Sequence, residues 1–96
     1  MITEHALLHI RKGQSAAFEA AMIKAKPLIA VSPGFLGIEV RHASEEDDLY
    51  LLLVEWESIA HHRDGFRVSA RYQEWRALLH GFYDPMPVVR YFGDGI

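Results

Sequence analysis

The chain contains no cysteine, no long apolar run and no excess of basic charge. Without cysteine it can form no disulfide, zinc–thiolate site, iron–sulfur cluster or thiol nucleophile. No apolar run approaches membrane-spanning length, and residues 1–5 lack the features of a signal peptide. The net charge is −3 and the basic residues are scattered, which argues against a nucleic-acid-binding face. These absences predict a cytoplasmic protein that binds neither membranes nor nucleic acids.

Several familiar catalytic patterns are missing as well. The sequence has no glycine-rich phosphate loop, no nucleophile elbow and no carboxylate cluster at metal-ligand spacing. His5 and His9 share one face of a predicted strand about 13 Å apart, too far for a common metal ion. What remains is 96 residues, half of them hydrophobic, with neither repeats nor linkers. We expect residues 1–96 to form one domain with its own core.

Apolar periodicity and turn residues predict six elements. Ser15 is a reasonable N-cap for the first helix, and Pro27 is expected to kink or interrupt it. Ser58 should cap a second helical region, which Gly65 or Ser69 breaks in two. In chain order the predicted elements are a strand at 2–11, a helix from 15 to the stop at 32–34, strands at 35–42 and 49–56, the helical region at 58–81 and a strand at 88–92.

This β-α-β-β-α-β order predicts a ferredoxin-like α+β fold, the split βαβ arrangement. Its sheet would be four-stranded and antiparallel, with the strands at 2–10 and 49–56 central and both helices on one face. The strand at 49–56 is nevertheless apolar on both sides, since leucines alternate with other apolar residues. Helices can cover only one of these faces. We therefore predict a homodimer that closes the other face; a buried centre with no partner is the alternative.

The second helical region carries an unusual apolar stripe. Ile59, His62 and Phe66 recur at helical spacing, followed by Tyr72 and Trp75. A core built only for stability has little use for an imidazole, a phenol and an indole together, because each buried polar tip needs a partner. The stripe indicates the lining of a cavity for a flat, partly polar ligand.

Five short segments occur along the chain in a characteristic order and spacing, although each is weak alone. They are Lys12-Gly13-Gln14, Ser32-Pro33-Gly34-Phe35, Val54-Glu55-Trp56-Glu57-Ser58 with His62, the stretch from Phe66 to Leu79, and Phe82-Tyr83-Asp84-Pro85. Together they resemble the antibiotic biosynthesis monooxygenase (ABM) family over essentially the whole chain.

The resemblance implies a dimeric α/β barrel with a pocket between the helices and the sheet of each protomer. Some members oxygenate quinol-like or polyketide-derived aromatics with O₂ and use no flavin, metal or haem. We therefore expect a cofactor-independent monooxygenase acting on a small electron-rich aromatic such as a quinol or anthrone. His62 would be the base or anion stabiliser, and Tyr72 would supply a catalytic hydroxyl. A non-catalytic dimeric small-molecule-binding module and an isomerase acting on a small carbonyl compound remain alternatives.

Trp56, Phe66, Trp75 and Arg76 are the candidate pocket residues. Each also has a plainer interpretation: the aromatic residues as ordinary core, with Trp56 a packing anchor at the dimer interface, and Arg76 as a surface cation. His62 could likewise be a buried neutral histidine bonded to backbone. We expect Arg67 and Arg76 to face solvent or to pair with one of the acidic residues Glu57, Asp64 and Glu74.

Haem degradation, known for other members, is not expected. Those members use a first-strand asparagine, where this chain has Ala6. Their tryptophan position falls at Gly65 or Phe66 here.

Overall fold

Two strands form the centre of a four-stranded antiparallel sheet in the computed structural model, which describes all 96 residues. β1 (Ile2–His9) and β3 (Leu49–Trp56) pair along their whole length. β2 (Phe35–His42) lies outside β3, and the short β4 (Arg90–Phe92) lies outside β1. The resulting order β2-β3-β1-β4 confirms the ferredoxin-like prediction, including its central pair.

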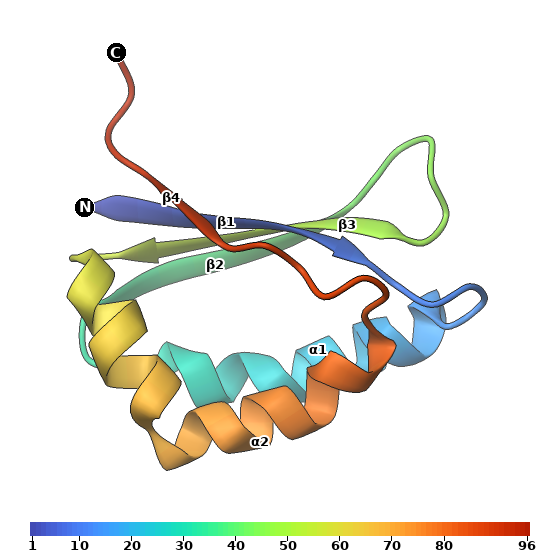
Figure 1. The fold of residues 1–96 in the computed structure, drawn as a ribbon, viewed down its shortest axis with the longest axis horizontal. Helices are drawn as coiled ribbons and strands as arrows, with labels where there is room; N and C mark the ends of the chain where they lie inside the picture. The colour runs from blue at the N-terminus through green and yellow to red at the C-terminus, as the bar shows by residue number, and fades with distance from the viewer.

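All the helices cover the same face of this sheet (Figure 1). α1 (Ser15–Ala30) and α2 (Ala70–Leu79) pack side by side beneath it. Between β3 and α2 the chain forms a π-helical turn, η1 (His61–Gly65), and a 3-10 turn, η2 (Phe66–Val68). A last 3-10 turn, η3 (His80–Phe82), leads toward β4. None of these helices is both long and apolar enough to cross a membrane.

The structure corrects two expectations about α1. The helix runs through Pro27 to Ala30 without interruption, because burial of Ala25 and Ile29 on either side outweighs the one lost hydrogen bond. Ser15 is the first helical residue rather than the N-cap, and its hydroxyl donates to the Asp47 carbonyl oxygen. The end of the chain also differs from expectation, since the last strand begins at Arg90 rather than at residue 88.

The inner face of the sheet forms the core together with the helices. Alternate residues of β1 and β3 point toward α1 and α2, and Trp56, Phe18 and Phe66 are the largest fully buried side chains. Along β1 this inward set includes one acidic residue, Glu4, which is as buried as its apolar neighbours.

The opposite face of the sheet has no helix over it (Figure 1). Leu51 and Leu53 are half-buried there, whereas Leu7 and Phe92 are 45% and 51% exposed. This is the apolar second face that the sequence predicted. We refer to it below as the open face.

Candidate active site

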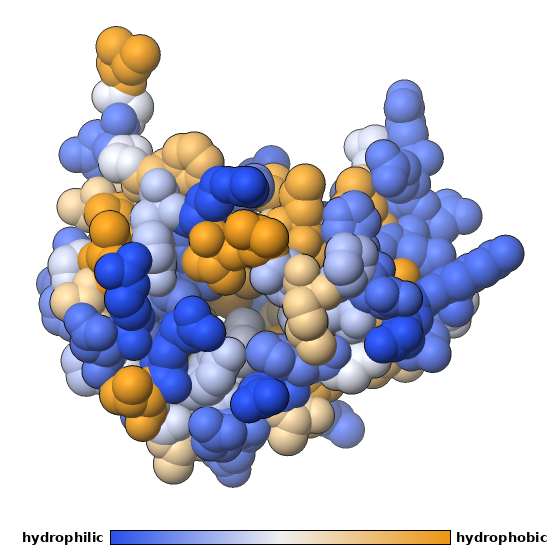
Figure 2. All heavy atoms as spheres, viewed as in Figure 1, coloured by the Kyte–Doolittle hydropathy of each residue, from blue (hydrophilic) through white to orange (hydrophobic).

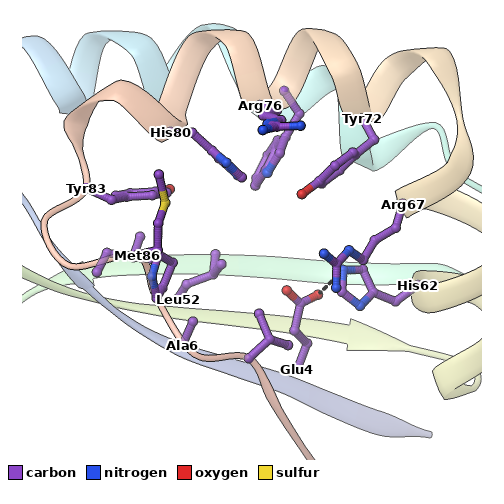
Figure 3. Close-up of a pocket in the computed structure, with 14 residues that line it drawn as sticks. Glu4, Ala6, Leu52, His62, Arg67, Tyr72, Arg76, His80, Tyr83 and Met86 are labelled. Carbon is purple, nitrogen blue, oxygen red and sulfur yellow. Dashed lines mark ion pairs between the residues drawn. The ribbon is translucent and has the colours of Figure 1, made fainter.

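A cavity of about 420 Å³ lies between the inner face of the sheet and α2. Figure 2 shows the molecule from the side on which hydrophobic and hydrophilic side chains meet around a central hollow, and Figure 3 shows the cavity walls. β1 and β3 form its floor, α2 its roof and the segment before β4 its far end. The lining residues are Glu4, Ala6, Leu8, Leu52, His62, Arg67, Tyr72, Trp75, Arg76, His80, Tyr83, Met86, Pro87 and Val89.

His62 is directed inward by contacts of its neighbour His61. Ser58 accepts a hydrogen bond from the His61 backbone N–H, which starts the predicted helical turn, and the Ser58 hydroxyl lies 2.8 Å from His61 Nδ1. The His61 ring rests on Gly34, where a Cβ would come within 2.2 Å of it. Gly34 also has φ +79°, a conformation that favours glycine. With His61 held against this turn, the next residue points toward the sheet.

Glu4 lies at the inner end of the cavity. The strand alternation of β1 turns its side chain toward the helices, and only 5% of that side chain is exposed. Trp56 Nε1–H donates to Glu4 Oε1 at 2.9 Å. Burial raises the pKa of Glu4 from 4.5 to about 7, against smaller lowering effects of the Trp56 hydrogen bond and the Arg67 charge. The carboxyl group therefore gains and loses its proton near neutral pH.

His62 lies beside this carboxyl group. Its Nε2 is 3.4 Å from Glu4 Oε1, the contact dashed in Figure 3, and its Nδ1 is 2.6 Å from the Tyr91 hydroxyl oxygen. Burial and, to a smaller extent, the charges of Arg67 and Arg63 lower the pKa of His62 from 6.5 to about 4. At neutral pH the imidazole is neutral, so its contact with Glu4 joins a neutral ring to a carboxyl group and is not a charged pair.

Two guanidinium groups line the same cavity without acidic partners. Arg67 and Arg76 are exposed overall and neither forms an ion pair, so of the two expectations for them the solvent-facing one is met. The Arg67 guanidinium lies 5.7 Å from the centre of the Tyr72 ring. The Tyr72 hydroxyl is directed into the cavity (Figure 3). Both cations therefore remain free for a ligand.

The end of the cavity away from Glu4 is more apolar. His80 and Tyr83 lie there beside Met86 (Figure 3). Burial lowers the pKa of His80, as do the charges of Arg76 and Arg67, so this imidazole is also neutral at pH 7. Burial raises the pKa of Tyr83, which keeps its hydroxyl protonated. This end thus offers apolar surface with a few neutral hydrogen-bonding groups.

The structure brings four of the six predicted site residues to the cavity: His62, Tyr72, Trp75 and Arg76. Trp56 and Phe66 do not line it. Their rings are fully buried behind its wall, with Trp56 holding Glu4 and Phe66 packed against Tyr72 and Trp75.

The sequence reasoning missed Glu4 as a site residue, although a signal was present. Glu4 stands in an otherwise apolar alternation set, with Ile2, Ala6, Leu8 and Ile10 as its companions. A lone acid in such a set faces the core, where an ionisable group requires partners.

No group of three or more histidine, cysteine, aspartate or glutamate side chains is placed to hold a metal ion. The polar groups of the cavity are instead one carboxyl, two neutral imidazoles, two phenols and two guanidinium groups. Aromatic and aliphatic side chains form the remaining walls. This arrangement suits a small planar molecule that carries hydroxyl or carbonyl groups.

Comparison with known proteins places the chain in a family. The family model described as antibiotic biosynthesis monooxygenase matches residues 1–78. A Bacillus subtilis (strain 168) protein of uncharacterised activity, YczJ, is 47% identical over 94 residues, which cover 98% of this chain and 99% of that protein. A Bordetella bronchiseptica crystal structure assigned to the antibiotic biosynthesis monooxygenases is 33% identical. It superposes with a TM-score of 0.93 over 99% of this chain and 97% of the other.

The chain therefore belongs to the antibiotic biosynthesis monooxygenase family. The cofactor-independent oxygenase SnoaB of Streptomyces nogalater shares the fold, with a TM-score of 0.86 over 99% of this chain and 93% of that one. Its sequence identity to this chain is 16%, so that similarity concerns the fold alone.

Proposed function

We propose that this protein is a cofactor-independent monooxygenase that oxidises a small electron-rich aromatic, of quinol, anthrone or polyketide type, with O₂. The observation that carries the proposal is the polar inner end of an aromatic-walled cavity, where Glu4 and His62 lie buried side by side. Family membership supports the same reaction class. A cavity of about 420 Å³ is within the usual range for small-molecule sites.

The chemistry requires a proton acceptor in a dry site. Removing the proton from a ring hydroxyl gives an electron-rich anion, which reduces O₂ directly. One oxygen atom enters the substrate and the other leaves as water, and the substrate supplies the electrons. Glu4 and His62 form the proton-accepting end of the cavity, because the pKa of Glu4 is about 7 and the His62 imidazole is neutral at that pH.

Five of the lining residues have roles in this reaction. Of the two roles predicted for His62, that of stabilising an anion by hydrogen bonding is favoured, because a pKa of about 4 makes the imidazole a weak base. The Tyr72 hydroxyl donates to a substrate oxygen, and Trp75 packs against the ring. Arg67 and Arg76 attract negative charge that develops on the substrate.

The direct test is oxygen uptake by metal-free protein with a panel of hydroquinones, anthrones and catechols. We expect uptake above the buffer rate, and a decrease of about 100-fold or more in kcat/KM for His62→Ala. Glu74→Gln, an exposed change on α2 outside the cavity, is the control and should retain wild-type activity. A panel that produces no uptake would exclude the oxygenase.

The alternatives predict different results in the same assay. A binding module would be stabilised by these compounds without converting them, seen as a raised melting temperature. An isomerase would act equally well without oxygen. Running every compound aerobically and anaerobically therefore separates the three functions.

We further propose that the protein is a homodimer joined through the open face. The apolar side chains there, Leu7, Leu51, Leu53 and Phe92, lie on three adjacent strands and have no helix over them. Light scattering after gel filtration should give twice the 11.0 kDa chain mass. Leu7→Glu places a charge in the proposed contact and should shift the protein toward monomer; a wild-type monomer would refute the dimer.

A further inference from the structure

We propose that Glu4 is the catalytic proton acceptor, and that Trp56, His62 and Tyr91 are positioning residues that hold it. This assignment rests on the proposed oxygenase reaction. It differs from the sequence-based expectation, in which His62 was the base or anion stabiliser for the substrate and neither Glu4 nor Tyr91 had a role.

The geometry around the carboxyl group favours Glu4. Both of its close contacts, from Trp56 Nε1 at 2.9 Å and from His62 Nε2 at 3.4 Å, involve Oε1. Oε2 makes no hydrogen bond to the protein, and Figure 3 shows the carboxyl group directed into the cavity. One oxygen atom is thus anchored, and the other faces the space where a substrate hydroxyl would lie. Glu4 is also the only acidic residue among the lining residues.

The surroundings of Glu4 give it a suitable proton affinity. It is faced by Trp56 from β3, His62 from η1, Arg67 from η2 and Tyr91 from β4, with Tyr83 farther along the cavity. Burial opposes ionisation, whereas the indole N–H and the Arg67 charge favour it. The balance puts the pKa of the carboxyl group at about 7, where a general base is effective at physiological pH.

Tyr91 acts through His62. Its hydroxyl group lies outside the set of cavity-lining residues but 2.6 Å from His62 Nδ1. If that hydroxyl donates to Nδ1, the ring proton resides on Nε2, the atom that faces Glu4. The Nε2–H group then donates to Oε1 when the carboxyl group ionises, and the 3.4 Å separation shortens to a hydrogen bond. Tyr91 thereby sets the tautomer that stabilises the reactive carboxylate.

The proposed step transfers one proton and no electrons. The substrate O–H bond breaks, a new O–H bond forms at Glu4 Oε2, and the negative charge moves from the carboxylate to the substrate oxygen. Arg67 lies on the same cavity wall to attract that charge. The protonated Glu4 returns its proton to water after the product leaves.

Glu4→Gln tests the acceptor, because it retains an oxygen atom for Trp56 but cannot accept a proton. We expect kcat/KM to fall by about 100-fold or more. Glu4→Asp, which shortens the side chain but keeps the carboxyl group, should retain part of the activity. Glu74→Gln is the control, and circular dichroism checks that each variant is folded. Wild-type kcat/KM in Glu4→Gln would overturn the proposal.

Tyr91→Phe tests the positioning role through the pH dependence of kcat/KM, which a change in packing alone would not shift. Loss of the donor to Nδ1 frees the ring proton to leave Nε2, so the pKa of Glu4 should rise. The limb of the pH–kcat/KM profile near pH 7 should shift upward by about one unit. Glu74→Gln, an exposed change on α2 outside the cavity, is the control and should leave this limb in place. An unshifted limb in Tyr91→Phe would overturn the positioning role.

A measurement without substrate separates this inference from the oxygenase proposal. ¹³C NMR of carboxyl-labelled protein should show one glutamate that titrates near pH 7, absent in Glu4→Gln and shifted upward in Tyr91→Phe. If no compound supports oxygen uptake but this titration appears, the oxygenase proposal is wrong, whereas the raised pKa of Glu4 and the contacts that hold its carboxyl group are supported. If uptake occurs and Glu4 titrates near its ordinary value, the acceptor assignment fails and the oxygenase stands.

Discussion

The two faces of the central strand pair carry one glutamate each, in very different surroundings. Glu4 of β1 faces the helices, is almost fully buried and contacts Trp56 and His62. Glu55 of β3 faces the other way, is half-buried and accepts hydrogen bonds from the Thr3 hydroxyl at 2.8 and 3.0 Å. The same side chain is thus a candidate base on one face and an ordinary cross-strand partner on the other.

The difference follows from strand geometry. Successive side chains of a strand point to opposite faces, so a shift of one residue exchanges a helix-covered environment for an open one. Burial on the covered face raises the pKa of Glu4 to about 7 by penalising its charged form. Its position in the strand alternation thus decides which of the two environments a carboxyl group meets once the helices have packed on the sheet.

The largest expected effect comes from placing a charge on each face at adjacent positions. Leu52 lies on the covered face and is 5% exposed, whereas Leu51 lies on the open face. Leu52→Asp should lower the free energy of unfolding by about 4 kcal/mol or more, because it removes core contacts and buries a charge. Leu51→Asp should instead give a folded monomer. Urea denaturation and light scattering measure the two outcomes, and equal destabilisation would contradict the asymmetry of the faces.

An intermediate effect is expected in the pH dependence of stability. Below pH 4.5 Glu4 is protonated in both the folded and the unfolded protein. Between pH 4.5 and 7 Glu4 ionises in the unfolded chain but stays largely protonated in the folded protein, so rising pH favours unfolding. The penalty reaches roughly 3 kcal/mol above pH 7 for a shift of this size. Glu4→Gln should therefore gain stability relative to wild type as the pH rises from 4.5 to 8. Urea denaturation at both pH values measures the gain.

Glu55→Gln is the matched control on the open face, where solvent screens the charge. Its stability relative to wild type should change less over the same pH range. The wild-type curve alone is less informative, since His62 contributes the opposite slope. Its pKa is lowered from 6.5 to about 4, so its contribution to stability is lost as the pH falls through that range. A Glu4→Gln curve parallel to wild type would show that Glu4 is not buried as an ionisable group.

The smallest effect is expected at α2, one of the helices that cover the inner face of the sheet. Ser69 accepts a hydrogen bond from the Tyr72 backbone N–H and begins α2, so Ser69→Ala should cost about 1 kcal/mol. The melting temperature should fall by about 4–8 °C, with the open face and the oligomeric state unchanged. Differential scanning calorimetry measures this shift. A change of subunit mass in this variant would mean that the two faces are coupled.

The sequence predicted the fold well, because its signals were periodic and local. Alternation identified β1, and a continuous apolar run identified β3. Ser58, Gly65 and Ser69 marked where the second helical region begins and breaks. It failed at Pro27, where a local penalty was outweighed by burial elsewhere in the same helix.

The candidate site was predicted only in part. Helical spacing identified the inward stripe with His62, Tyr72 and Trp75, all of which line the cavity. The partners of His62 could not be found this way, because Glu4 and Tyr91 are 58 and 29 residues away in the chain and meet it only through the pairing of β1 and β4.

By itself, the sequence determined which residues form strands and helices and which side chains point inward, since these depend on periods of 2.0 and 3.6 residues along the chain. Only the tertiary structure decided that Glu4 ends beside His62 and Trp56, almost fully buried at the end of a cavity. Proton affinity depends on desolvation and on neighbouring charges, and both arise when distant segments pack together.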